Sequence, residues 1–177
     1  MEDKGNDFAW DGLETNDSCY VVIGYSNSSA SGDVSGTTNG GQDFWVVKLD
    51  STGNVIWDKL LGGSADELAF SVKQTSDNGY IVVGRSSSSA NGDVSDANNG
   101  IHDYWIVKLD NAGNIEWDKL YGGSGSDIPI EVQELSGGGY IIGGYSTSSK
   151  SGDVVEPNHG NNDFWILKLD ASGNIQN

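Results

Sequence analysis

The feature that most constrains this chain is a period of 60 residues. The segment Asp43–Asp50, which reads Asp-Phe-Trp-Val-Val-Lys-Leu-Asp, returns in similar form at Asp103–Asp110 and at Asp163–Asp170. Tyr20 and Gly24 recur at the same offset, and no insertion interrupts the series. Self-similarity at a fixed period is typical of repeat architectures. The sequence therefore predicts a single β-repeat domain over 1–177, with repeats at approximately 1–60, 61–120 and 121–177.

Each copy predicts four short strands. Leu68–Lys73 alternates apolar and polar side chains, as a half-buried strand does. Tyr80–Val83 and Trp105–Val107 are continuous apolar runs, which are typical of strands covered on both faces. Ile115–Leu120 supplies the fourth strand, and Gly113 before it suits a turn position with positive φ. The prediction is an all-β fold.

A four-stranded unit of this length cannot bury both faces alone, so its copies must pack on one another. The packing is radial in a β-propeller and linear in a solenoid. Four strands per unit with aromatic residues at fixed positions favour propeller blades, because solenoid coils are usually shorter and simpler. Three blades are too few for a ring, since propellers have about four to eight. We expect either a piece of a longer array or self-association, as a homo-oligomer in which two chains form a six-bladed ring or as a polymer.

Several motifs follow one another along the chain. They are Leu-Asp-x-x-Gly-Asn, a strand with Trp, Leu-Gly-Gly-Ser-x-x-(Asp/Glu), and Gly-Tyr-(Ile/Val)-x-x-Gly-x-Ser. In this combination the whole chain resembles the bacterial β-propeller repeats known as seven-bladed, or SBBP-type, repeats. The resemblance implies a propeller that belongs to large exported or cell-surface proteins, and it transfers no catalytic residue. Two departures are that Cys19 stands where Gly79 and Gly139 occupy the turn, and that there are three copies.

The charge excludes some partners. The formal net charge is −17, from 26 acidic and 9 basic residues, so binding to a nucleic-acid backbone is unfavourable. The single Cys19 allows neither an internal disulfide nor a cysteine zinc site. No apolar run predicts a signal peptide or a membrane-inserted helix. We expect an extracellular or cell-surface location for the natural protein, in line with the resemblance.

The loops between the second and third strands carry many oxygen ligands. They span 26–42, 86–102 and 146–162, and carboxylates stand in them among Asn and Gly residues. Calcium takes six to eight oxygen ligands, and small residues let a backbone wrap around the ion. Local turns capped by Asp side chains, with other Asp residues anchoring the next strand, explain the same pattern without a metal. The candidate calcium ligands are Asp33, Asp43, Asp93, Asp96, Asp103, Asp153, Glu156 and Asp163.

A second acidic position recurs just before the first strand of each copy, at Asp7, Glu67 and Asp127. In a propeller these residues would ring one mouth of the central channel, where ligands bind. A solvated turn that needs a polar residue is the commoner explanation of such a position. They are the candidate ligand-binding residues.

The tryptophans and the remaining polar residues offer no catalytic set. Trp45, Trp105 and Trp165 lie in apolar strands and are expected in the core. Trp57 and Trp117 are candidates for stacking on a sugar, and the alternation of their strands equally allows them to face inward. Neither a nucleophile elbow nor a nucleotide-binding loop occurs.

Three functions fit these patterns. The first is a non-catalytic bacterial surface or secreted scaffold for protein or glycan interaction or self-assembly, with calcium as a candidate stabilising ion. The second is a lectin or carbohydrate-active propeller; its sign would be an acidic pair in one blade, and Glu131 and Glu134 of the third copy are the candidates for it. The third is a purely structural, self-assembling subunit. Recurrence of equivalent residues in every copy favours the first and argues against an enzyme.

Overall fold

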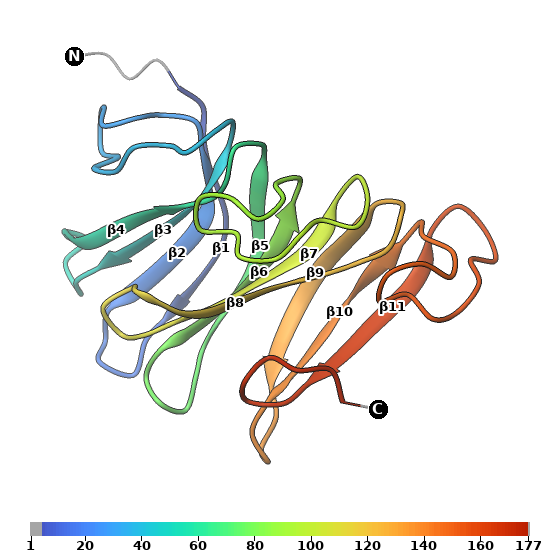
Figure 1. Cartoon of the computed structure of the whole chain (residues 1–177). Helices are drawn as coiled ribbons and strands as arrows, with labels where there is room; N and C mark the ends of the chain where they lie inside the picture. Colours follow the sequence, from blue (N-terminus) through green and yellow to red (C-terminus); the bar gives the residue numbers. More distant parts are fainter. Residues whose placement is uncertain (1–4, 177) are drawn as a thin grey trace.

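The computed structural model describes residues 5–176, and it is all-β: these residues form eleven strands and no helix. It therefore contains no helix long and apolar enough to cross a membrane. Neighbouring strands are antiparallel throughout, in three sheets with orders β1-β2-β3-β4, β5-β6-β7-β8 and β9-β10-β11 (Figure 1). The strands are β1 Asp7–Glu14, β2 Tyr20–Ser26, β3 Asp43–Leu49, β4 Val55–Leu61, β5 Glu67–Gln74, β6 Tyr80–Ser86, β7 Asp103–Leu109, β8 Ile115–Tyr121, β9 Asp127–Glu134, β10 Tyr140–Ser146 and β11 Asp163–Leu169.

The prediction of four strands per copy is confirmed for the first two copies. The first two copies each form a four-stranded meander, and the third forms three strands within the described residues. Asn78 adopts φ 66° in the turn between β5 and β6, and Gly113 adopts φ 79° in the turn between β7 and β8. A residue tolerant of the left-handed region thus closes each hairpin, and at Gly113 the sequence predicts it.

The first strand of every sheet contains a register irregularity. The pairing shifts between Ala9 and Asp11 in β1, between Ala69 and Ser71 in β5, and opposite Gly143 and Gly144 in β9. Such bulges bend a strand and increase its twist. The three first strands thus share an irregularity at equivalent positions.

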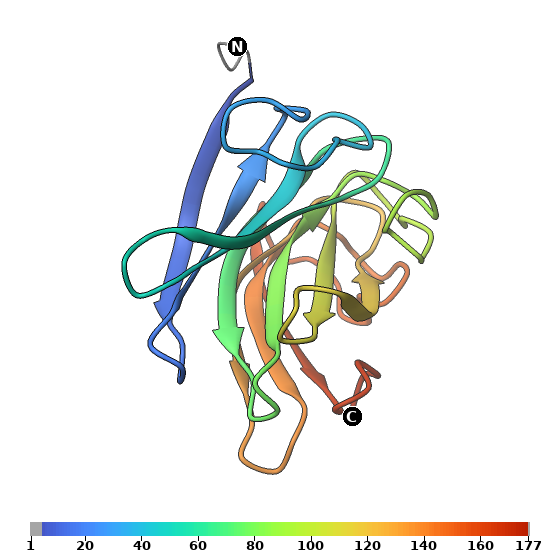
Figure 2. The same ribbon diagram turned by 90° about the vertical axis from the view of Figure 1, so that its left-hand side faces the viewer.

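The sheets lie face to face in chain order, and their first strands are neighbours. β5 contacts β1, and β9 contacts β5 (Figures 1 and 2). Apolar side chains fill the two spaces between the sheets, one cluster between the first and second sheets and another between the second and third. Within the described residues the sheets form an open stack that does not close into a ring. The second sheet is thus covered on both faces, whereas the first and third sheets are each covered on one face and leave the outer face open.

Candidate functional site

An aromatic residue at the start of β3, and another at the start of β7, contacts the following sheet. Phe44 in β3 lies 4.6 Å from the ring of Trp105 in the second sheet, and Tyr104 in β7 lies 4.6 Å from Trp165 in the third. Phe44 and Tyr104 are both fully buried. The two contacts are 60 residues apart, so the same junction is built twice.

A glycine receives each of these aromatic rings. A β-carbon on Gly84 would overlap with Phe44 Cζ and with the carbonyl oxygen of Leu68, which belongs to the bulged strand β5. Gly144 lies in the same way beneath the Tyr104 hydroxyl. Glycine is therefore required here by close approach.

Carboxylates gather at one end of each junction. In the first acidic junction (Asp43, Glu67 and Asp93), the Gly62 N–H donates to Asp93 Oδ2 at 3.1 Å and the Gly63 N–H donates to Glu67 Oε2 at 2.6 Å. Asp43 Oδ2 accepts from the Asn39 N–H at 2.7 Å. The three side chains come from two consecutive sheets and meet around the Gly-Gly turn.

The second acidic junction (Asp103, Asp127 and Asp153) repeats this arrangement. The Gly122 N–H donates to Asp153 Oδ2 at 3.1 Å, and the Gly123 N–H donates to Asp127 Oδ2 at 2.7 Å. Asp103 Oδ2 accepts from the Asn99 N–H at 2.7 Å. Asp103 and Asp127 are fully buried, as Asp43 and Glu67 are in the first junction.

One oxygen of Asp43 and one of Asp103 have no hydrogen-bond donor among the described residues. Burial raises the pKa of both carboxyls to about 6, with a further increase from the neighbouring carboxylates, Glu67 beside Asp43 and Asp127 beside Asp103. No Lys, Arg or His forms an ion pair with either side chain within residues 5–176. When Asp43 or Asp103 is protonated, its O–H can donate a hydrogen bond to the neighbouring carboxylate. Protonation thus gives the unpaired oxygen a partner and removes the repulsion between two negative charges.

The tertiary structure groups the predicted calcium ligands differently from the sequence. Asp93 and Asp153 accept hydrogen bonds from the Gly-Gly turn of the preceding sheet, so they belong to a different group from the other carboxylates of their own loop. Asp96 accepts a hydrogen bond from the Leu120 N–H at 3.3 Å, and Asp163 accepts one from the His159 N–H. Glu156 and Asp33 are exposed. Across the described part of the chain, no three His, Cys, Asp or Glu side chains are arranged to hold a metal ion. Calcium binding stays a prediction of the sequence.

The predicted ligand-binding residues do not share one environment. Glu67 and Asp127 are fully buried, where they accept hydrogen bonds from the chain. Asp7 is exposed and accepts hydrogen bonds from Ser26 and Ser28. Glu67 and Asp127 therefore face the neighbouring sheet, in a position that a ligand from solvent does not reach in this arrangement.

The carbohydrate candidates are engaged in packing. The ring of Trp57 lies 6.1 Å from Tyr80 in an edge-on contact, and that of Trp117 lies 5.9 Å from Tyr140. Trp57 also lies against Gly113 of the next sheet. These rings therefore face neighbouring protein, and no exposed sugar platform is formed by them.

The two glutamates of the third copy bond to the second sheet. Lys73 Nζ lies 2.6 Å from Glu131 Oε1, and the Ser76 N–H donates to Glu134 Oε2 at 2.9 Å. They serve as inter-sheet contacts.

Sequence reasoning overlooked an aspartate in the fourth strand of the first sheet and of the second sheet. Trp105 Nε1 donates to Asp118 Oδ2 at 2.9 Å, and Trp45 Nε1 donates to Asp58 Oδ2 at 3.1 Å. The recurrence of Trp-Asp-Lys-Leu at both places was the available signal.

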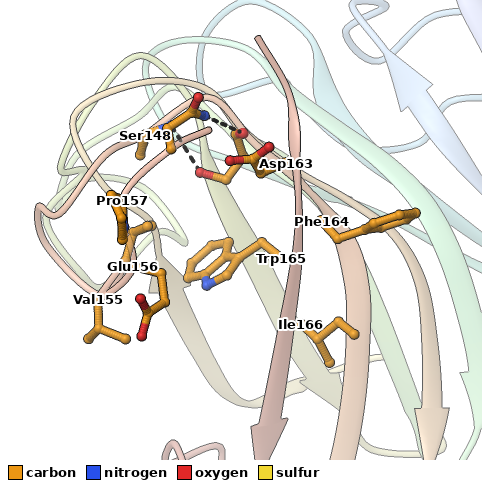
Figure 3. A pocket seen from close by; sticks show the side chains of 11 residues that line it. Ser148, Val155, Glu156, Pro157, Asp163, Phe164, Trp165 and Ile166 are labelled. Carbon is orange, nitrogen blue, oxygen red and sulfur yellow. Dashed lines mark hydrogen bonds between the residues drawn. The ribbon is translucent and has the colours of Figure 1, made fainter. Parts of the chain in front are cut away.

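The third sheet has a pocket where the other sheets have this strand. The pocket encloses about 220 Å³, and its lining includes Val155, Glu156 and Trp165. Figure 3 shows Trp165 turned toward the loop that carries Glu156, while Phe164 points to the other side of β11. A strand bearing Asp and Lys fills the corresponding space in the first two sheets.

No protein-family model matches the chain, and no curated protein matches it either.

Proposed function

We propose that this chain is a non-catalytic β-propeller module that acts as an extracellular or cell-surface scaffold and associates with further copies of itself. The observation that carries the proposal is the junction built twice from equivalent residues, Phe44 on Trp105 and Tyr104 on Trp165. A contact that repeats along a stack extends to any further sheet of the same kind.

A radial arrangement is supported by the neighbouring first strands. β1, β5 and β9 succeed one another across the stack, as the innermost strands of propeller blades do. Two copies supply six sheets, a number within the usual range of about four to eight blades. A rotation between copies that failed to close would give a filament.

The absence of catalysis is part of the proposal. Four carboxylates of the two acidic junctions, Glu67, Asp93, Asp127 and Asp153, accept hydrogen bonds from Gly-Gly turns between sheets at equivalent places. Glu131 and Glu134 bond to the second sheet. Structural partners of this kind favour a scaffold over a glycosidase centre.

Light scattering coupled to size exclusion tests the proposal. A single chain has a mass of 18.7 kDa, and we expect twice that mass or more at concentrations up to about 100 µM, where a micromolar interface is populated. Averaged electron micrographs of the oligomer should show a ring of blades. A single-chain mass throughout this range would overturn the proposal, and the same run with calcium and with chelator tests the calcium prediction.

A further inference from the structure

The outward face of the third sheet exposes the residues that the other sheets bury. Phe164 is 96% exposed, whereas its counterparts Phe44 and Tyr104 are 0% exposed. Ile166 is 62% exposed, and its counterpart Ile106 is again 0%. We call this surface the C-face, and it comprises Ile141, Gly143, Phe164 and Ile166.

The outward face of the first sheet is the complementary half. Tyr20 is 40% exposed, whereas Tyr80 and Tyr140 at the equivalent positions are 0% and 3% exposed. Gly24 pairs in register with Trp45, as Gly84 pairs with Trp105 in the sheet that receives Phe44. We call this surface the N-face, and it comprises Tyr20, Val22, Gly24 and Trp45.

We propose that the C-face of one copy docks on the N-face of a second copy, with Phe164 seated over Gly24 and against Trp45. This inference rests on the proposed self-association and identifies the surfaces that carry it. The chain makes the same contact twice between its own sheets, through Phe44 and through Tyr104. The C-face and the N-face carry the equivalent residues but have no sheet packed on them, so a second copy would supply the partner surface for each.

The acidic residues extend the correspondence. Asp163 of the C-face end is equivalent to Asp43 and Asp103. Asp7 and Asp33 beside the N-face are equivalent to Glu67 with Asp93, and to Asp127 with Asp153. Docking of the two faces would therefore bring together a third set of the same three carboxyl positions, contributed by two chains.

The interface is heterologous, because two different surfaces meet. A substitution on one face therefore leaves the other face of the same chain functional. This property separates the proposed contact from a symmetric contact, in which one substitution damages both partners.

Two single variants provide the test. Phe164→Asp places a charge at the centre of the C-face, and Val22→Asp does so on the N-face. Each variant alone should run as a single chain, with association weakened about 30-fold or more, as expected for loss of an anchor residue. Mixed in equal amounts, the two should form a complex of twice 18.7 kDa, because one intact C-face and one intact N-face remain.

Ile101→Asp is the matched control, since Ile101 is 61% exposed in a loop and lies outside both faces. It should associate as the unaltered chain does. Phe164→Ser is a second C-face variant with little risk to folding, because the side chain is almost fully exposed. Circular dichroism should report unaltered β structure in all variants.

The outcomes are distinguishable. Variants that still associate as the unaltered chain does would overturn the docking inference and leave self-association standing. Single variants that dissociate but fail to recombine would also overturn it, because a heterologous contact must be rescued by mixing. An unaltered chain that is itself a single copy would overturn self-association, and the docking inference with it.

Discussion

Asp43 and Glu67, from consecutive sheets, turn one carboxyl oxygen each toward the same glycine. A β-carbon on Gly62 would overlap with both Asp43 Oδ1 and Glu67 Oε2. Asp103 and Asp127 are arranged in the same way around Gly122. Each junction between sheets thus contains a buried pair of acids at its end, and the raised pKa of Asp43 and Asp103 predicts a stack that is sensitive to pH.

The first prediction concerns that sensitivity. Asp43 and Asp103 have a pKa of about 6 in the folded chain against an ordinary value of 3.8, so the folded state holds more protons between these two values. The free energy of unfolding should therefore fall as pH rises from 4.5 to 7.5, by about 1–2 kcal/mol for each carboxyl. Urea unfolding at the two pH values measures the difference.

Asparagine substitutions are the control for this prediction. In Asp43→Asn and Asp103→Asn, an uncharged amide donates to the neighbouring carboxylate as the protonated acid does. The double variant should lose most of the dependence between pH 4.5 and 7.5. Asp17 and Asp77 have a pKa of about 2 and keep their charge over this window. An unchanged slope in the double variant would show that other groups cause it.

The second prediction concerns Asp118, which is buried and accepts from both Trp105 Nε1 and the Ser95 N–H at 2.9 Å. Asp118→Ala leaves both donors without an acceptor, so it should lower the free energy of unfolding by about 2–4 kcal/mol. Trp105→Phe retains an aromatic ring but lacks the donor. A double-mutant cycle between the two should give a coupling of about 1 kcal/mol or more, and additive effects would contradict the hydrogen bond.

The third prediction compares two glycines. Gly84→Ala places a methyl group against Phe44 and the Leu68 carbonyl, and it should lower stability by about 3 kcal/mol or more. Gly143→Ala meets no atom within 4 Å and should change the free energy of unfolding by less than about 1 kcal/mol. Thermal unfolding of both variants makes the comparison. Equal effects would contradict the role of Gly84 as the seat of the aromatic ring.

The fourth prediction concerns the free edge of β11. Ile175 forms an antiparallel bridge with Leu169, and the Gln176 N–H donates to the Lys168 carbonyl at 2.8 Å. These residues therefore pair with β11 at the place where the other sheets have their fourth strand. A chain extended after residue 177 by Asp-Lys-Leu-Tyr should gain about 1–3 kcal/mol in unfolding free energy, because Trp165 then finds an acceptor. An extension with Ala in place of Asp is the control. Equal stability of the two extended chains would exclude the bond to Trp165.

The strands and turns of this fold followed from the sequence because they depend on residues close together in the chain. Alternation identified β5, apolar runs identified β6 and β7, and Gly113 marked a turn that needs positive φ. These are short-range properties of backbone sterics and side-chain polarity. The 60-residue period then predicted three copies of the same sheet, because equal sequences fold alike.

The composition of each site was decided by tertiary structure. Asp93 lies in the loop that leads to Asp103, the first residue of β7, yet Asp93 bonds at Gly62 of the preceding sheet, while Asp103 meets Asp127 of the following one. Alternation along a strand shows that two faces differ, but it does not show which neighbour covers each face. Only the stacking of the sheets determined that Glu67 and Asp127 are buried and that Phe164 is exposed, because burial depends on residues brought together from consecutive repeats.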